Sequence, residues 1–532
     1  MEGTGGSGPQ GTALPPPGCA APHDDGGQAG ASGVGRGAAP HRGVVRSGDG
    51  LPEGGKEALS RLCRDLHTSR ESGNPPAGLG PLGLERCAGG PRPRGGGPPP
   101  PHPGTHPGAR HGDGPQETGR SPPRELEMNA PEPPALTPRL TNPAELIALQ
   151  SELAQMGVDG WLLYDFRDQN PLAHHLLGLG KTTRRAFAYF PAQGDPILLR
   201  HAIEASAWRH WPWEARVYRG WDDLTAGLET LLHGVGVVAM ESSPGGDVPT
   251  VDRVPAGALE GVQKTGTRVV SSGDLVTRYH SSWGPEGRAS HLRASKVVRE
   301  TVHAAFHHAA LAAGEGRPVG EAALMDWIRG RLRERGLREQ VDCSVATGRN
   351  ASDPHYHPEG PGALLAEETL VLIDLWGAEP GGIPADQTWM AWLGESPDDR
   401  TLQVYDAVRG ARDGALDFLR ERARSGKEVR GFEVDRVARD LLAREGLDRW
   451  FAHRLGHSID RELHGSGPNL DDLETRDVRK ILVDTGFSVE PGVYIPGEIG
   501  VRSEVNVYWG PDGPEVTPDR IQEELLRIPL RG

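Results

Sequence analysis

The chain is organised around the stretch His453-Arg-Leu-Gly-His457-Ser-Ile-Asp-Arg-Glu-Leu-His464. It carries three histidines in an apolar, glycine-bearing setting, with His453 four residues before His457 and His464 seven residues after it. Carboxylates lie on both sides of this stretch along the chain. Four carboxylates and one imidazole suit two hard or borderline divalent cations. The sequence therefore predicts a site for two metal ions, with the ligands Asp374, Asp386, His457, Glu490 and Glu504.

The four carboxylates lie in two predicted hairpins. The apolar run 370–375 places Asp374 in a buried strand, and Gly381-Gly382 turns the chain so that Asp386 returns beside it. Glu490 and Glu504 lie in two further β-rich runs, and the segment 496–500 between them suits a tight turn. An unpaired carboxylate in an apolar strand is costly and needs a cation or a hydrogen-bond partner; the alternative for Asp374 is an aspartate that caps a turn. Five ligands on two ions leave open positions for a bridging water, which the ions convert to hydroxide at neutral pH.

The first 127 residues differ in composition from the rest. Gly and Pro are concentrated there, in runs such as 95–102, and the few aliphatic residues cannot offset the entropy of ordering the segment. We expect residues 1–127 to be a disordered leader, with a weak helical pattern at 56–67 as a local exception. We also hypothesise that Met128 is the true start, because protein-like sequence begins soon after it; the alternative is a genuine flexible tail.

The net charge of −15 falls on the part that follows this leader. An acidic ordered part argues against nucleic acid and against anionic membranes as the main partner. The sequence contains no apolar run of transmembrane length and no apolar signal-peptide core after Met1. Of the four cysteines only Cys343 lies in the folded part, which excludes a disulfide framework there. We expect a cytoplasmic protein.

Beyond residue 140 the pattern is α/β, with a predicted domain boundary near 280–287. For the first domain, 140–282, it predicts helices at 143–156 and 224–232 and buried strands at 160–164, 186–190, 196–199 and 235–240. For the second, 285–532, it predicts helices at 290–313, 319–335, 398–424 and 433–445, strands at 342–347 and 368–376, and mainly strand-like structure after 451.

The order Asp, Asp, His, Glu, Glu, with the flanking Gly456-His457, Val489-Glu490-Pro-Gly492 and Arg502-Ser-Glu504, closely resembles the pita-bread metallopeptidases. This family, of the creatinase and methionine aminopeptidase fold, includes methionine aminopeptidase, Xaa-Pro aminopeptidase and prolidase. Residues 285–532 carry the motifs, and residues 140–282 are similar to the creatinase-type N-terminal domain of the proline-directed branch. The implied architecture is an α/β (α+β) chain, with a creatinase-like N-terminal domain followed by a pita-bread catalytic domain.

The resemblance implies a role for each matching residue. Glu490 would help the attacking water to lose its proton, and His355 and His464 would contact the substrate carbonyl or the tetrahedral intermediate. His453 would lie beside the site, and Arg502 would orient carboxylates or substrate. Arg476, fourteen residues before Glu490, would pair with the free carboxylate of a dipeptide. The alternatives are a solvated loop arginine at 476 and Arg479 in its place.

One departure concerns the first hairpin. The family usually spaces its two aspartates by eleven residues and follows the first with Asp-x-Gly, whereas here the gap is twelve and Trp376 precedes Gly377. We expect the turn to absorb the additional residue, as a β-bulge.

The sequence thus predicts a metallopeptidase that cleaves the Xaa-Pro bond, of dipeptides in the first place. Two divalent ions are implied, Mn²⁺ foremost with Co²⁺ and Zn²⁺ as alternatives. The resemblance implies a homodimer, and we expect no nucleic-acid or membrane partner. The alternatives are an Xaa-Pro aminopeptidase that acts on longer peptides, a metal-free creatinase-like amidinohydrolase, and a pseudo-peptidase that binds peptides without cleaving them.

Overall fold

The computed structural model describes residues 140–530. The predictions for residues 1–127, including the helix at 56–67, and the predicted start at Met128 lie outside the described residues. Short 3₁₀ helices connect the larger elements, namely η2 (Ala202–Glu204), η3 (Pro244–Gly246), η4 (Pro249–Val251), η5 (Gly348–Ser352) and η6 (Asp448–Trp450).

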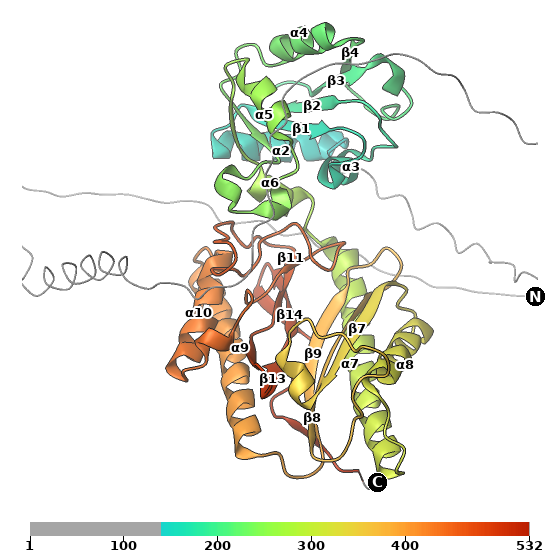
Figure 1. Ribbon diagram of the computed structural model, residues 1–532. Coiled ribbons are helices and arrows are strands. Elements are labelled where there is room, and N and C mark those ends of the chain that lie inside the picture. Colours follow the sequence, from blue (N-terminus) through green and yellow to red (C-terminus); the bar gives the residue numbers. More distant parts are fainter. Residues whose placement is uncertain (1–139, 531–532) are drawn as a thin grey trace, which may run out of the picture. The chain divides into compact units, whose positions relative to one another are not determined.

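Residues 143–279 contain a mixed sheet with helices around it (Figure 1). In spatial order its strands are β4 (Glu214–Tyr218), β3 (Ile197–His201), β2 (Ala186–Pro191), β1 (Gly160–Asp165), β5 (Val237–Met240) and β6 (Arg268–Ser271). The helices are α2 (Pro143–Met156), α3 (Pro171–Leu177), α4 (Trp221–Leu231), α5 (Ala256–Gln263) and α6 (Gly273–Tyr279). The predicted helix start is present, since the Asn142 side chain accepts the Ala144 N–H ahead of Pro143. Strands β4 and β6 were not predicted from the sequence, because they are short and each begins with a charged residue.

A second sheet is formed by β16 (Leu526–Ile528), β9 (Ala385–Leu393), β8 (Thr369–Ala378) and β7 (Glu339–Thr347), in this order. Helices α7 (Gly284–Gly314) and α8 (Glu321–Glu334) cover one face of it. Successive side chains of a strand point to opposite faces. Val371, Ile373 and Leu375 of β8 accordingly pack with α7 and α8, whereas Leu370 and Leu372 face the other way.

The other face of β8 and β9 is covered by the last part of the chain. A sheet of β10 (Ser458–Ile459), β11 (Thr485–Val489), β14 (Val505–Gly510) and β15 (Gly513–Thr517) lies there with the hairpin of β12 (Gly492–Ile495) and β13 (Ile499–Arg502). Helices α9 (Asp399–Ser425) and α10 (Gly431–Arg444) share its hydrophobic core with Leu370 and Leu372. In Figure 1 these strands lie between α7 and α8 on one side and α9 and α10 on the other.

The pairing of β8 with β9 corrects one prediction. The register runs without interruption from the pair Thr369 and Leu393 to the pair Gly377 and Ala385. The predicted bulge is therefore wrong for this hairpin, and the additional residue lies in the turn between the two strands. The irregularity of this sheet is on the opposite side of β8, where the β7 register shifts between Glu339 and Asp342.

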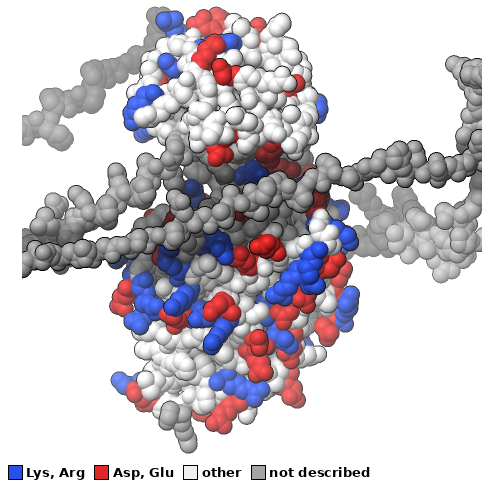
Figure 2. All heavy atoms as spheres, turned by 180° about the vertical axis from the view of Figure 1, so that it is seen from behind, with Lys and Arg blue, Asp and Glu red and all other residues white. Residues whose placement is uncertain are grey.

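Across residues 140–530, no helix combines the length and the apolar character that crossing a membrane requires. Acidic and basic side chains are interspersed on the face of the molecule in Figure 2, without a large field of one sign.

Candidate metal centre

The β8–β9 hairpin presents Asp374 and Asp386 from one face. Asp374 lies opposite Thr388, and Asp386 lies opposite Trp376, so the four side chains are on the same side of the hairpin. This is the side of Leu372, which packs into the core formed with α9 and α10. The alternation that buries Leu372 thus also turns the two aspartates toward the last part of the chain, where Asp386 is buried and Asp374 is partly buried.

The β12–β13 hairpin supplies the two glutamates. Glu490 lies just before β12 and its N–H donates to Leu455 O at 2.8 Å, whereas Glu504 lies just after β13 and its N–H reaches Thr388 O at 3.3 Å. These backbone bonds hold both ends of the hairpin against the loop before β10 and against β9. The two hairpins therefore meet at their carboxylates, as the sequence predicts.

His457 enters from the loop before β10. Its N–H donates to Ser488 Oγ at 2.9 Å, and its carbonyl accepts the Ser488 N–H at 2.9 Å. Gly456 precedes it because an added Cβ would lie 2.0 Å from Ser488 O. The ring Nδ1–H donates to Ser458 O at 3.1 Å, which leaves the lone pair of Nε2 free for a metal.

The five predicted ligands come together. His457 Nε2 lies 3.5 Å from Asp386 Oδ2 and 3.4 Å from Glu490 Oε1. Ligand atoms of Asp386, His457 and Glu504 all lie within 4.8 Å of one another. Asp374 is linked to the cluster by Arg502, which also contacts Thr388 beside Glu504.

Three carboxylate oxygens of this cluster are buried without a hydrogen-bond partner among residues 140–530, namely Asp374 Oδ1, Asp386 Oδ1 and Glu504 Oε1. Burial, with repulsion from the neighbouring carboxylates, raises the pKa of Asp374 to about 7 and that of Asp386 to about 8, and raises the pKa of Glu504 well above its usual value. A buried, unpaired acceptor is costly, and a cation removes that cost. The donor set therefore fits divalent cations.

Polar neighbours hold the ligands in place. Arg502 Nη2 donates to Asp374 Oδ2 at 2.6 Å, and Arg502 Nε donates to Thr388 Oγ1 at 2.9 Å. Thr388 Oγ1 in turn donates to Glu504 Oε2 at 2.8 Å. The buried Arg502 thus contacts the carboxylate cluster directly, through Asp374 and through Thr388 beside Glu504, as an arginine that orients carboxylates would.

Both ring nitrogens of His453 are occupied. Nδ1–H donates to Arg454 O at 2.7 Å, and Nε2 accepts the Tyr494 hydroxyl at 3.0 Å. His453 lines the cavity at the site but has no free nitrogen for a substrate. It fits a positioning role next to the ligands.

A cavity of about 590 Å³ opens onto the cluster. His355 and His464 line it together with the five predicted ligands. The His464 ring centroid lies 4.3 Å from that of His457 in an edge arrangement. Burial and the neighbouring His457 lower the pKa of His464 to about 4, so its imidazole is neutral at pH 7 and retains one N–H donor.

Arg476 does not line this cavity. Its side chain is 58% exposed, its Nε lies 3.7 Å from Asp472 Oδ1, and its guanidinium carbon lies 4.3 Å from the Phe432 ring centroid. The structure therefore brings Arg476 to Phe432 and Asp472 and not to the predicted carboxylate-binding position. Fourteen residues of chain separate it from Glu490, and that spacing does not decide where the loop side chain points.

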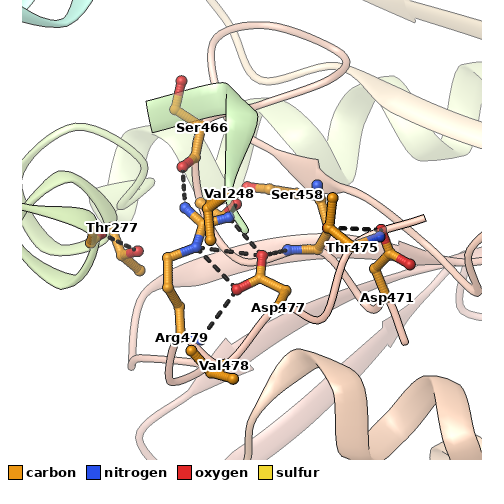
Figure 3. A network of polar contacts seen from close by, with 12 residues as sticks. Val248, Thr277, Ser458, Ser466, Asp471, Thr475, Asp477, Val478 and Arg479 are labelled. Atoms are coloured by element: carbon orange, nitrogen blue, oxygen red, sulfur yellow. Dashed lines mark hydrogen bonds and ion pairs between the residues drawn. The ribbon is translucent and has the colours of Figure 1, made fainter. Parts of the chain in front are cut away.

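The alternative, Arg479, is also occupied elsewhere. Figure 3 shows its guanidinium between Asp477 and the backbone of Ser466. Nη2 donates to Asp477 Oδ2 and to Gly467 O, each at 2.6 Å, and both partners of the ion pair are buried. Arg479 holds the loop together and does not line the cavity.

Trp376 and Arg454 are among the cavity residues to which the sequence assigned no role. Trp376 lies on the face of Asp374, and the signal for it was the spacing of two along a strand. Arg454 lies within the stretch 453–464, directly after His453, and lines the cavity as well. No sequence pattern indicates the direction of its side chain.

Residues 290–510 match the model described as Metallopeptidase family M24. An Xaa-Pro dipeptidase from Lactobacillus helveticus is 32% identical over 197 residues, which are 37% of this chain and 49% of the relative. Another from Lactobacillus delbrueckii subsp. lactis is 34% identical over 191 residues, which are 35% of this chain and 47% of the relative. The chain spans about half the length of these curated relatives.

Solved structures resemble this chain over a longer range. The dipeptidase PepE from Mycobacterium ulcerans has a TM-score of 0.57 at 23% identity, over 72% of this chain and 97% of that one. The Xaa-Pro dipeptidase from Bacillus anthracis has a TM-score of 0.52 at 20% identity, over 73% of this chain and all of that one, 100%. At these identities the likeness concerns the fold, and it confirms the predicted α/β architecture. The domain boundary near 280–287 stays a prediction.

Proposed function

We propose that this chain, whose residues 290–510 form a metallopeptidase family M24 domain, is a peptidase that hydrolyses Xaa-Pro bonds with the help of two divalent cations. The observation that supports it most is the buried cluster of Asp374, Asp386 and Glu504, each with an unpartnered carboxylate oxygen among the described residues, next to the free Nε2 of His457. Such a donor set is stabilised by cations, because Arg502 and Thr388 satisfy only one oxygen each of Asp374 and Glu504.

Asp374, Asp386, His457, Glu490 and Glu504 would hold the two ions. When bound, the ions supply Lewis-acid activation of water and of the substrate carbonyl. Arg502 and Thr388 keep the carboxylates in place, and Nδ1 of His457 stays bound to Ser458 O, which fixes the tautomer that presents Nε2.

Glu490 is the proton acceptor in this proposal. Ser488 Oγ donates to its Oε1 at 3.0 Å. Burial raises the pKa of Glu490, but His457, His453 and Arg502 outweigh burial and lower it overall, so the carboxylate is ionised and ready to take a proton from the attacking water. The same proton then passes to the leaving nitrogen of proline. His355 and His464, which line the cavity, donate to the oxyanion that develops on the carbonyl oxygen.

Dipeptides are the proposed substrates, because the matched Lactobacillus relatives carry the name Xaa-Pro dipeptidase. The alternative is removal of the first residue from longer Xaa-Pro peptides.

Mn²⁺ is the proposed metal, since four carboxylates and one imidazole favour a hard to borderline cation, with Co²⁺ and Zn²⁺ as alternatives. A homodimer in the cytoplasm stays a prediction, which sedimentation analysis and cell fractionation check.

The experiment is hydrolysis of Xaa-Pro dipeptides, Xaa-Pro-Yaa tripeptides and Met-Ala-Ser, after chelation and with Mn²⁺ restored. Metal-restored cleavage of the dipeptides alone supports the proposal, and cleavage of the tripeptides moves the assignment to an aminopeptidase. Glu490→Gln should abolish turnover, whereas Glu498→Gln, an exposed glutamate at the turn of the same hairpin, should not. Metal binding without cleavage of any peptide would favour a pseudo-peptidase.

A further inference from the structure

We propose that the sheet within residues 143–279 carries a second binding site, which takes a nucleoside di- or triphosphate. The phosphate groups lie against a cluster of arginines, and the base lies on an exposed tryptophan. The lining residues of this site are all different from those of the metal centre. The inference therefore goes beyond the proposed hydrolysis of Xaa-Pro bonds and does not depend on it.

Strands β1, β3 and β4 end at the same edge of this sheet. β3 and β4 are parallel, and β1 runs in the same direction because β1 and β3 are both antiparallel to β2. A cavity of about 660 Å³ opens at this edge, lined by Tyr164, His201 and Tyr218 from the last residues of the three strands. Its volume is that of a small-molecule site, and the carboxyl ends of strands are where open α/β sheets bind ligands.

The charged side chains that line this cavity are cationic. Arg184 and Arg185 directly precede β2, which begins at this edge, and Arg219 directly follows β4. Burial raises the pKa of Tyr164 and of Tyr218, and the positive charge of Arg185 opposes this rise in both, as expected for a guanidinium near both rings. No Asp or Glu of residues 140–530 lines the cavity, although the chain has a net charge of −15. The cavity therefore attracts anions.

The three guanidinium groups have hydrogen-bond donors available. Within residues 140–530 none of them forms an ion pair, and Arg184 donates only to its neighbour Thr183, at 3.1 Å to O and 3.2 Å to Oγ1. Within the same range the side chains of Arg185 and Arg219 make no hydrogen bond. A phosphate group can accept two parallel N–H bonds from such a guanidinium.

Nearby carboxylates are bound to other partners. Glu204 Oε1 accepts the N–H of Thr183 at 2.9 Å and its hydroxyl at 2.6 Å. Asp223 Oδ2 accepts the backbone N–H of Arg219 at 3.1 Å and leaves the guanidinium of that residue free. The positive charge of the cavity is therefore not compensated by these two acids.

An exposed indole forms the apolar part of the site. Trp221 is the first residue of α4 and lines the cavity, and it is 73% exposed. Every other tryptophan of residues 140–530 is buried or partly buried. Phe166 lines the cavity as well. An aromatic face that is left in water gains free energy when a planar ring stacks on it, and every nucleobase has such a ring.

A nucleotide matches both parts of this cavity. Its phosphates carry several negative charges for three arginines, and its base is planar and suits the indole. A single carboxylate would leave most of the positive charge without a partner, and inorganic phosphate would leave the indole in water. Because all bases stack, we expect adenine and guanine nucleotides to bind alike.

The test is equilibrium dialysis of the full chain with ATP, GTP, tripolyphosphate and adenosine, in the Mn²⁺-loaded form and again in chelator. ATP and GTP should each bind at one site per chain in both conditions. Arg185→Gln should weaken the binding of ATP and of tripolyphosphate by roughly 10- to 100-fold, because charged hydrogen bonds are lost. Trp221→Ala should weaken ATP by roughly 5- to 100-fold and leave tripolyphosphate within about twofold, because only stacking is lost.

The matched control is Arg268→Gln. This exposed arginine begins β6, which is parallel to β5 and so to β1, and it therefore lies at the opposite edge of the sheet. The control should bind ATP as the wild type does. Arg219→Gln, at an exposed position, repeats the test of the phosphate contacts if Arg185→Gln does not fold.

Three results would overturn the inference. The first is the absence of saturable ATP binding by the wild type. The second is ATP binding that disappears in chelator or that persists in both arginine variants, since the nucleotide would then bind elsewhere, such as at metal ions. The third is equal affinity for ATP and tripolyphosphate with no effect of Trp221→Ala, which would show an adventitious anion only. Hydrolysis of Ala-Pro is measured separately, so a failure of either proposal leaves the other standing.

Discussion

Replacing Asp386 with Asn exchanges an ionisable carboxyl group of the buried cluster for a neutral amide of nearly the same size. Without metal, Asp386 has a pKa raised from 3.8 to about 8, by burial first and by Glu490 second. Because the unfolded chain releases this proton near pH 4 and the folded chain near pH 8, the free energy of unfolding falls by about 1.4 kcal/mol per pH unit between these values. At pH 7 the cost is about 4 kcal/mol, which Asp386→Asn removes.

The expected result is a reversal of the stability order. The entropy of unfolding is about 2 cal/mol/K per residue, or about 0.8 kcal/mol/K for roughly 390 residues, so the metal-free variant should melt about 5 °C above the metal-free wild type. Free metal at about 100 times Kd stabilises the wild type by about 2.7 kcal/mol per site, or about 3 °C. Two filled sites raise the wild type by about 7 °C, whereas a variant that has lost this charged ligand and binds neither ion keeps its metal-free Tm, so in metal the wild type should melt about 2 °C higher.

Differential scanning calorimetry in chelator and in saturating Mn²⁺ measures the melting temperatures of the wild type and of Asp386→Asn in each buffer. Asp512→Asn, an exposed aspartate between β14 and β15, is the matched control and should follow the wild type in both buffers. The argument that a cation stabilises the unpartnered carboxylates would be refuted by either of two results. One is a variant that is less stable than the wild type in chelator, and the other is a wild-type Tm that does not change when divalent ions are added.

Three further predictions concern single residues. His464→Ala should lower kcat by roughly 100- to 1000-fold because an oxyanion donor is lost, with both ions per chain retained in metal analysis. Burial lowers the pKa of His291 to about 4, so this histidine should contribute a loss of about 3 kcal/mol as the pH drops from 6.5 to 4, when the unfolded chain takes up the proton first. Because Asp386 has the opposite effect in the metal-free chain, the slope should appear in the difference between urea titrations of the wild type and of His291→Gln. Gly486→Ala should cost about 1–3 kcal/mol in urea unfolding, because its Cβ would lie 1.7 Å from Trp283 Cζ2; an unchanged midpoint would contradict this close approach of β11 to the indole.

The grouping of the carboxylates with His457 could be predicted because its determinants are local. The apolar run around Asp374 predicts a buried strand, and the turn residues after it and between Glu490 and Glu504 predict hairpins. The period of two then places Asp374 and Asp386 on one face. The structure brings these carboxylates and His457 into one cluster, although the hairpin absorbs its additional residue in the turn and not in a bulge.

The arginines could not be predicted in the same way. Arg476 and Arg479 lie in an irregular loop, where no periodicity relates spacing to direction. The pairing of Arg479 with Asp477 and the packing of Arg476 on Phe432 decide their directions. Arg454 lies in the stretch that identified the site, yet its access to the cavity depends on neighbours outside that stretch, such as Glu474.

The sequence by itself determined the α/β class, the two hairpins and the donor set, because strand alternation and turn chemistry are properties of neighbouring residues. Only the tertiary structure decided which carboxylate oxygens stay without a partner and which arginine faces the cavity. Those outcomes depend on which hydrogen bonds form between segments more than one hundred residues apart, such as the bond between Asp374 of β8 and Arg502 of β13.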